Sequence, residues 1–355
     1  MAAAIALPVR TATVRRPRSQ RPRIVAVEPR LSVVIVNYCQ WKNTARLAKQ
    51  LRHSMAARSG IAEIVIVDNR SPGSRLVGKL RRTDGISLRR FKRNRGFAKA
   101  VNEGCRLSRG DWFLLLNPDM SVPPDFLNDV ESLVKRIEAE DPRVGVVGLG
   151  VRNSDGSTQP SCGPLPTLLG TLGGLCLPRS LRKCKPLTAD SRTDVPWATG
   201  CALLVRKECL NDVGGFDEDF FLYYEDVDFC RRAAEGGWKV CHEPSLSVTH
   251  HTPLHTREVS APLRFVTRHA LLTYGIKHWS RLQSTLLGGL IWLEASARQF
   301  KAWCKGQADD AFFHAQTRRI VGHALAQRHR DVRRGIRHAA DNLAAGAAAQ
   351  DGKTS

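Results

Sequence analysis

The sequence predicts an α/β protein with a mostly parallel sheet and helices on both faces. Short runs of β-branched and apolar residues alternate with segments of helical periodicity, as in residues 32–36 followed by residues 43–58. Runs that are apolar throughout are typical of strands buried on both sides of a parallel sheet. Alternation of such strands with helices indicates a doubly wound sheet.

The strands are expected where these apolar runs fall. Residues 199–206 continue the pattern after an interruption, and a last strand is expected to end before His250 and His251. The other expected strands are residues 32–36, 64–67, 86–91, 112–116 and 144–149.

Helices are predicted between these strands from apolar residues at helical spacing. Gly110 is expected to stop the helix that includes Ala98 and Cys105, and Pro123 and Pro124 to open the next one. Residues 150–195 are rich in Gly, Pro and Ser and show little periodicity, so we expect a long loop or lid there.

The charge is concentrated at the two ends of the chain. The chain has 355 residues, 42% of them hydrophobic, and a formal net charge of +22. Residues 1–30 contain seven arginines against one glutamate, and the region after about residue 260 is again basic. Such ends favour an anionic partner, which leaves nucleic acid and anionic lipid open. The leader is interpreted as a disordered basic tail, with an organellar transit peptide as the alternative.

Ten cysteines without a C-x-x-C pair predict reduced thiols in a cytosolic protein. A zinc site that combines Cys39 or Cys241 with a distant histidine is the alternative. The apolar residues at the start precede the arginines, which is the reverse of a secretory signal.

Polar clusters follow three of the predicted strands. They are Asn37-Tyr38, Asp68-Asn69 and Asn117-Pro118-Asp119. Ligands of open parallel sheets bind beyond the carboxyl ends of the strands, so one ligand could contact all three clusters.

The run Tyr223-Tyr224-Glu225-Asp226-Val227-Asp228 concentrates carboxylates at the start of a predicted helix, residues 225–235. One carboxylate that faces a cleft could act as a general base. The alternative is that the acids only interact with the positive end of the helix dipole.

Six short motifs follow one another along the chain: Val34-Ile35-Val36-Asn37-Tyr38, Val67-Asp68-Asn69, Asn94-Arg95-Gly96-Phe97-Ala98, Leu116-Asn117-Pro118-Asp119, Gly214-Gly215-Phe216-Asp217 and Tyr224-Glu225-Asp226-Val227-Asp228. In this order and at these intervals, they resemble the motifs of family 2 glycosyltransferases, in particular the rhamnosyltransferase-like branch. The resemblance covers about residues 31–255 and implies a GT-A fold that transfers a sugar from a nucleotide diphosphate with inversion.

The resemblance implies a donor site for a UDP- or dTDP-sugar. Asp68 could accept the imide N–H of a pyrimidine base and Tyr38 could stack on it. Gly96 would let backbone amides approach ribose or phosphate at the start of the helix that holds Asn102. Without the resemblance, a turn-capping Asp68 and a solvent-facing Tyr38 are the alternatives. The expected nucleotide-binding residues are Asn37, Tyr38, Asp68, Asn94, Gly96, Asn102 and Asn117.

The resemblance also implies a divalent cation, Mg²⁺ or Mn²⁺. Asp119 is expected to bind it, and His250 fits the position of the family's histidine better than His251. Asn117 departs from the usual pair of acids, so the metal is expected to arrive with the nucleotide. The alternative for Asn117-Pro118-Asp119 is a simple Asx-Pro turn.

Asp226 is implied as the catalytic base, with Glu225 and Asp228 in support. Arg232 is expected to pair with the acids of its helix. The acceptor is expected to be a cell-surface glycan or a lipid-linked saccharide, as in polysaccharide and cell-wall biosynthesis, and the donated sugar to include rhamnose as a candidate.

Three regions are expected: a disordered tail (1–30), a catalytic domain (31–256) and a basic helical extension (257–355). Leu282, Leu286, Leu290 and Leu293 share a helix face there, flanked by basic residues. This helix could lie on an anionic membrane, which would place the protein in the cytoplasm or on the cytoplasmic membrane face. The alternative is that the leucine face packs on the catalytic domain.

Two other classes of function compete. A nucleic-acid-binding protein would explain the basic ends but not the acidic centre, because phosphates would be repelled by the carboxylates there. A nucleotidyltransferase could also use such a sheet with a metal-binding carboxylate.

Overall fold

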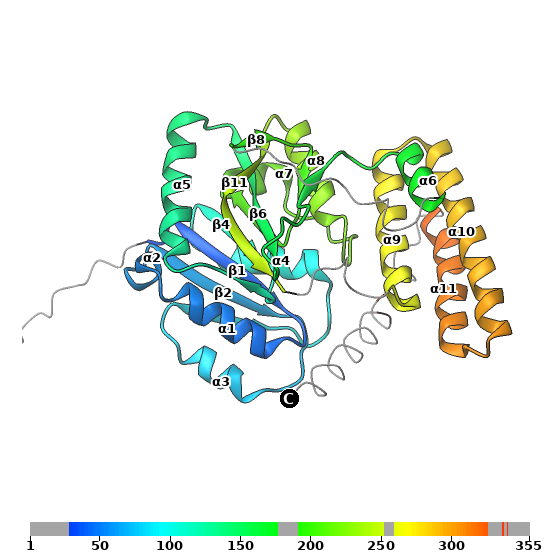
Figure 1. Cartoon of the computed structure of the whole chain (residues 1–355), viewed down its shortest axis with the longest axis horizontal. Helices are drawn as coiled ribbons and strands as arrows, with labels where there is room; N and C mark the ends of the chain where they lie inside the picture. The colour runs from blue at the N-terminus through cyan, green and yellow to red at the C-terminus, as the bar shows by residue number, and fades with distance from the viewer. Residues whose placement is uncertain (1–27, 177–190, 252–258, 326–335, 337–338, 340–355) are drawn as a thin grey trace, which may run out of the picture.

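The computed structural model describes residues 28–176, 191–251, 259–325, 336 and 339. The predicted basic tail lies almost wholly outside these residues. The main sheet has nine strands (Figure 1): β1 (Leu31–Asn37), β2 (Ala62–Asp68), β3 (Ile86–Arg90), β4 (Trp112–Leu116), β5 (Met120–Ser121), β6 (Val144–Asn153), β8 (Thr193–Asp194), β10 (Ala202–Arg206) and β11 (Lys239–His250).

The α/β class predicted from the sequence is confirmed, and the sheet combines parallel and antiparallel pairs. The strand order is β3-β2-β1-β4-β10-β6-β11-β5, with β8 paired to β11. Strands β3, β2, β1 and β4 are parallel, as are β6 and β11. Strand β10 runs antiparallel to both of its neighbours, β4 and β6. An apolar run predicts a buried strand but not its direction.

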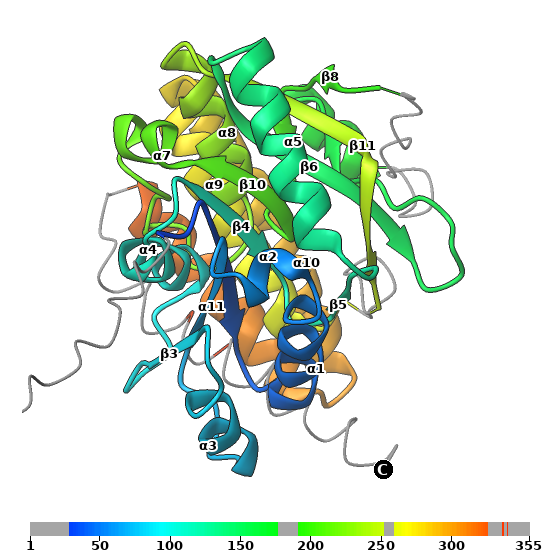
Figure 2. The ribbon, with the colours of Figure 1, turned by 90° about the vertical axis from the view of Figure 1, so that its left-hand side faces the viewer.

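Helices cover both faces of the sheet (Figures 1 and 2). Alternate residues of β1 enter different cores, because successive side chains of a strand point to opposite faces. Val33 and Ile35 pack in one core with residues of α1 (Trp41–Leu51), α2 (Met55–Arg58), α3 (Arg75–Arg81) and α5 (Phe126–Glu140). Val34 and Val36 pack in the other core with residues of α4 (Phe97–Leu107), α7 (Lys207–Val213) and α8 (Glu225–Glu235).

Two predicted segments differ from the structure. The expected helix at residues 43–58 is divided into α1 and α2 by a turn at His53 and Ser54. The expected loop at residues 150–195 contains the end of β6, strand β7 (Cys162–Gly163), helix α6 (Leu168–Cys176) and strand β8. Strand β7 pairs with β9 (Trp197–Ala198), which follows this segment. The leucines of α6 are separated by glycines, which conceal its helical character. Residues 177–190 lie outside the described ranges.

The expected helical extension begins with α9 (Ala261–His278), α10 (Arg281–Cys304) and α11 (Ala308–Leu325). Figure 1 shows α9 nearest the sheet, with α10 and α11 beyond it. Tyr274 of α9 packs against Phe220 and Val227, so this unit contacts α8 directly. Within the described ranges, none of the helices combines the length and the apolar character that a membrane span requires.

Candidate active site

The register of the strands brings the predicted polar clusters to one edge of the sheet. Asn37 lies opposite Asp68 across β1 and β2, and Leu116 lies beside β1 at the end of β4. Because β10 is antiparallel to β4, the residues that precede β10 lie at this same edge. The Asn117 backbone N–H accordingly donates to the Cys201 carbonyl, at 3.0 Å.

Asn37 and Asp68 form a buried network beneath this edge. Neither side chain is exposed, and the Asn37 amide donates to Asp68 Oδ1 at 2.8 Å and to the Ser71 hydroxyl at 2.9 Å. Arg90 Nε donates to Asp68 Oδ2, also at 2.8 Å. In this conformation the partners of Asp68 are protein groups. The pair therefore supports the strand ends around the half-buried Tyr38, and the expected contacts of Asn37 and Asp68 with a nucleotide stay a prediction.

A second network shapes the turn before α4, and its centre is Asn69, which no expectation assigned a role. The Asn69 amide donates to Asn94 Oδ1 at 2.8 Å, and its oxygen accepts from the Arg95 backbone N–H at 2.7 Å. Gly96 has a φ of 91°, and a Cβ there would lie 2.8 Å from the Phe221 carbonyl oxygen. Glycine is therefore required by both conformation and space.

Asn102 contacts protein backbone rather than open space. Its amide donates to the Phe216 carbonyl at 2.8 Å, and its oxygen accepts from the Phe216 backbone N–H at 2.9 Å. This two-point contact fixes the Gly214-Gly215-Phe216-Asp217 segment to α4. Asn102 therefore supports this segment, and its expected contact with a nucleotide stays a prediction.

Asp119 and His250 lie side by side at the edge. His250 Nε2 is 3.4 Å from Asp119 Oδ2, and both residues are nearly buried. Their proximity follows from the antiparallel pairing of β5 with β11, in which His250 lies opposite Met120. His250 Nδ1 lies 3.2 Å from Gln159 Oε1, which orients the ring.

His251, the alternative to His250, is directed toward serines. Its Nε2 lies 2.7 Å from the Ser121 hydroxyl and its Nδ1 lies 3.2 Å from the Ser154 hydroxyl. The residue that faces Asp119 is therefore His250.

The pair Asp119 and His250 fits a divalent cation that has further ligands from elsewhere. A carboxylate oxygen and an imidazole nitrogen are suitable donors for such an ion. No group of three or more His, Cys, Asp or Glu side chains with metal-binding geometry occurs within the described residues. Oxygens of a nucleotide diphosphate and water would have to complete the coordination.

Asp226 lies at the start of α8, where it is held against the segment before β10. Its Oδ2 accepts from the Gly200 backbone N–H and its Oδ1 from the Val227 backbone N–H, both at 2.8 Å. Burial raises the pKa of Asp226, while hydrogen bonds from Gly200, Val227 and Thr199 act in the opposite direction. A raised pKa suits a carboxylate that must take up a proton.

The charges of Asp226 and Asp119 both act on the buried thiol of Cys201. Burial raises the pKa of its thiol to about 12, and the charges of Asp226 and Asp119 add to this effect. Both carboxylates therefore lie close enough to Cys201 to act on the same group. This thiol is buried and neutral, as expected from the sequence.

Glu225 differs from its neighbour because it is enclosed. It is 5% exposed, and among the described residues its Oε2 has no hydrogen-bond partner. Burial, reinforced by the negative charge of Asp226, raises the pKa of Glu225 well above its usual value. Glu225 thus differs from Asp226, whose two carboxylate oxygens both accept backbone hydrogen bonds.

The two tyrosines before α8 adopt a backbone conformation that is rare for residues with side chains. Tyr223 has a φ of 72° and Tyr224 a φ of 65°. Each such residue costs on the order of 1–3 kcal/mol and commonly marks a functional site. The Tyr224 ring lies 5.7 Å from that of Tyr274 in α9, so the helical extension supports this strained turn.

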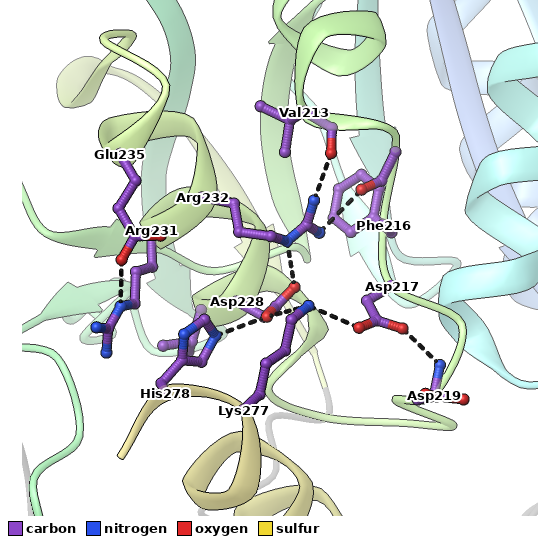
Figure 3. Close-up of polar contacts among 12 residues, drawn as sticks. Val213, Phe216, Asp217, Asp219, Asp228, Arg231, Arg232, Glu235, Lys277 and His278 are labelled. Atoms are coloured by element: carbon purple, nitrogen blue, oxygen red, sulfur yellow. Dashed lines mark hydrogen bonds and ion pairs between the residues drawn. The ribbon is translucent and has the colours of Figure 1, made fainter. Parts of the chain in front are cut away.

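Asp228 connects α8 to its surroundings rather than to the open edge (Figure 3). Arg232 Nε donates to its Oδ2 at 2.8 Å, and Lys277 Nζ and His278 Nε2 lie 2.8 and 2.7 Å from its Oδ1. Burial acts to raise the pKa of Asp228, but hydrogen bonds from His278 and Lys277 and the charge of Arg232 lower it overall. The expected pairing of Arg232 with an acid of its helix is confirmed.

An open α/β sheet with a carboxylate and a histidine at its carboxyl edge, together with an acidic helix start, is the arrangement expected of a GT-A enzyme. The chain belongs to glycosyl transferase family 2, whose model matches residues 32–214. It is therefore a glycosyltransferase, and its resemblance to the rhamnosyltransferase-like branch is confirmed.

Two relatives illustrate this branch. The chain is 30% identical over 241 residues to an N-acetylglucosaminyl-diphospho-decaprenol L-rhamnosyltransferase of Mycobacterium tuberculosis, covering 62% of this chain and 76% of that protein. It is 28% identical over 162 residues to rhamnosyltransferase WbbL of Escherichia coli, covering 45% of this chain and 60% of the relative.

A solved structure supports the fold. The structure of GalNAc-T7 with UDP, GalNAc and Mn²⁺ matches with a TM-score of 0.50 and 19% identity, covering 69% of this chain and 48% of that one.

Proposed function

We propose that this enzyme transfers a sugar, with rhamnose the leading candidate, from a UDP- or dTDP-sugar to a hydroxyl of a lipid-linked saccharide or glycan. The observation that carries the proposal is the position of Asp226, a carboxylate with a raised pKa whose charge acts on Cys201 together with that of Asp119. The names of the two rhamnosyltransferase relatives support the sugar, and that of the mycobacterial relative supports a lipid-linked acceptor.

The nucleotide is proposed to bind over the ends of β1 and β2. Tyr38 would stack on the base, and backbone amides at Gly96 would approach ribose or phosphate. Asn117 would line the same edge. Asn37, Asp68, Asn94 and Asn102 would act by holding these elements, as their hydrogen bonds within the protein support.

The divalent cation, Mg²⁺ or Mn²⁺, is proposed to be held by Asp119 and His250. When bound, such an ion would stabilise the charge of the departing diphosphate. The structure of GalNAc-T7 with UDP, GalNAc and Mn²⁺ supports this combination.

The proposed base is Asp226. It would accept the proton of the acceptor hydroxyl while that oxygen forms a bond to the anomeric carbon and the bond to the nucleotide diphosphate breaks. Attack from the side opposite the nucleotide would invert the anomeric configuration. Glu225 would be the enclosed neighbour of the base, and burial raises its pKa so that it holds its proton more tightly than an exposed glutamate.

A lipid-linked acceptor would place the enzyme in peripheral contact with an anionic membrane on its cytoplasmic side. The basic composition of the helical extension supports this proposal. Nucleic acid is not the expected partner, because the acidic start of α8 would repel phosphates.

The test begins with a thermal-shift screen of UDP- and dTDP-sugars in the presence of Mn²⁺. Donors that bind tightly stabilise the native state by mass action. The best donor is then incubated with a lipid-linked saccharide, and acceptor-dependent release of nucleoside diphosphate is measured. Asp226→Asn should abolish most of this release, whereas Asp84→Asn at an exposed loop should not. Exchange of pyrophosphate instead would indicate a nucleotidyltransferase and overturn the proposal.

A further inference from the structure

Helix α10 has apolar side chains on two opposite faces. One face packs in the helical unit: Leu287 and Ile291 share a core with Leu271 and Leu272 of α9 and Val321 of α11. Residues at the same angular position, including Ala295 and Ala302, are also buried. An ordinary surface helix buries one apolar face against the core, and this face of α10 does so. The packing of the helical unit therefore does not explain the apolar residues on the other face.

The opposite face carries an exposed stripe of large apolar residues. The spacing of its members keeps them on one side of the helix. The stripe consists of Leu282 (70% exposed), Leu286 (50%), Leu293 (60%), Phe300 (66%) and Trp303 (73%). The alternative that the leucine face packs on the catalytic domain is therefore wrong.

The stripe is too continuous to be a chance set of exposed residues. Single exposed apolar side chains are normal, but a row along one helix marks an interaction surface. Helix α10 has 24 residues and is therefore about 36 Å long at about 1.5 Å per residue. Helix α6 lies near the start of α10, because Leu168 and Gln283 line a common cavity of about 550 Å³. The next residue of α6, Leu169, is a further exposed leucine.

Basic side chains flank the stripe. Arg281 lies at its start and Lys301 and Lys305 near its end, and all three are exposed. Residues 261–325 contain nine lysines and arginines against three acidic residues. The acid within α10, Glu294, accepts hydrogen bonds from Arg264, Arg268 and Arg298, and these arginines hold its pKa at about 2 against the effect of burial.

We propose that this stripe docks α10 flat on an anionic lipid surface, with its leucines and aromatic rings at the boundary of headgroups and acyl chains. The positive charge of the helical unit distinguishes an anionic membrane from a second copy of this chain as the partner of the stripe. A second copy of this chain would bring two basic helical units face to face, which repel each other, whereas anionic headgroups attract them. An apolar face bordered by basic residues is the pattern of helices that lie in a membrane interface. The inference deepens the proposed contact of the enzyme with a lipid-linked acceptor.

The test is sedimentation of the full chain with vesicles of phosphatidylcholine and phosphatidylglycerol, compared with phosphatidylcholine alone. Binding to the anionic vesicles should fall about tenfold or more in the double variant Leu293→Glu and Phe300→Glu. Met55→Glu is the matched control, because Met55 is 59% exposed on α2, away from the stripe. It should bind like the wild type, and binding should weaken at high salt.

Two results would overturn the inference. One is equal vesicle binding by the double variant and the wild type. The other is a dimeric mass of the wild type by light scattering that becomes monomeric in the double variant, which would assign the stripe to a second copy.

A water-soluble acceptor separates this inference from the proposed function. Transfer to the soluble acceptor should be unchanged in the double variant, because the stripe lies outside the proposed site. Transfer without vesicle binding would reject only the docking surface, whereas vesicle binding without transfer to any acceptor would reject only the proposed function.

Discussion

Lys277 Nζ of α9 lies 2.8 Å from Asp228 Oδ1 of α8, and this contact joins the helical extension to the helix whose first turn holds the proposed base Asp226. Lys277 also donates to Asp217, at 2.6 Å. The extension is thus part of the support of the acidic helix. Nothing in the pattern of residues around 277 indicated this role, because the partners are distant in sequence.

The first prediction concerns Asp228, whose side chain is fully buried. We expect Asp228→Asn to lower the free energy of unfolding by about 2–4 kcal/mol, because Arg232, Lys277 and His278 lose the charge they share. Denaturant unfolding measures this loss. Glu235→Gln on the same helix removes only the exposed partner of Arg231 and should cost less than about 1 kcal/mol. Equal losses in the two variants would contradict the central role of Asp228.

The second prediction concerns Asp226. We expect Asp226→Asn to lower turnover by about 10²- to 10⁴-fold with little change in donor affinity, the scale of a lost general base. Steady-state kinetics and calorimetry with the donor measure the two quantities. Near-normal turnover would remove the role of Asp226 as base.

The third prediction is the pH dependence of the same step. Because burial raises the pKa of Asp226, the base becomes protonated, and turnover falls, at a pH above the usual value of about 3.9 for an aspartate. The pH profile of turnover checks this, with circular dichroism at each pH to establish that the protein stays folded. An activity that persists unchanged down to the usual pKa of aspartate would contradict it.

The fourth prediction concerns the metal. Asp119→Ala and His250→Ala should each weaken Mn²⁺-dependent binding of UDP, measured by calorimetry with and without the ion. His251→Ala is the matched control, because that ring is directed to Ser121 and Ser154. Equal weakening of UDP binding by all three variants would contradict a specific role of Asp119 and His250. Unchanged affinity in Asp119→Ala would reject Asp119 as a metal ligand.

The sequence predicts the local elements well and the long-range contacts poorly. Apolar runs located β1, β2 and β4, and α8 has the predicted bounds, because these features depend on neighbouring residues. The direction of β10 and the pairing of β5 with β11 depend on the whole fold. The sequence therefore left open which of His250 and His251 lies beside Asp119, and the structure places the His250 ring there.

For the site residues, too, the sequence predicted local features better than long-range contacts. Motifs identified the strand ends, but the burial of Asn37 and Asp68 and the contacts of Asn102 depend on partners elsewhere in the chain. Asn69 was within a quoted motif and could have been given a role from it. The strained turn at Tyr223 and Tyr224 had no signal, because sequence patterns do not report a positive φ in a residue with a side chain.

The last prediction concerns Glu225, whose pKa burial raises well above that of a glutamate in the unfolded chain. Folding must then take up a proton, and this costs about 1.4 kcal/mol for each pH unit between the unfolded and the folded pKa. Because the folded pKa is raised, the stability from Glu225 is fully present below the unfolded pKa, about 4.3, and is lost as pH rises toward the folded pKa. Glu225→Gln keeps the shape without this titration, so its stability relative to the wild type should increase from pH 5 to pH 8. Denaturant unfolding at several pH values measures the difference. A difference that stays constant across this range would mean that Glu225 is ionised in the folded protein, with a donor at its Oε2 that the described residues do not supply.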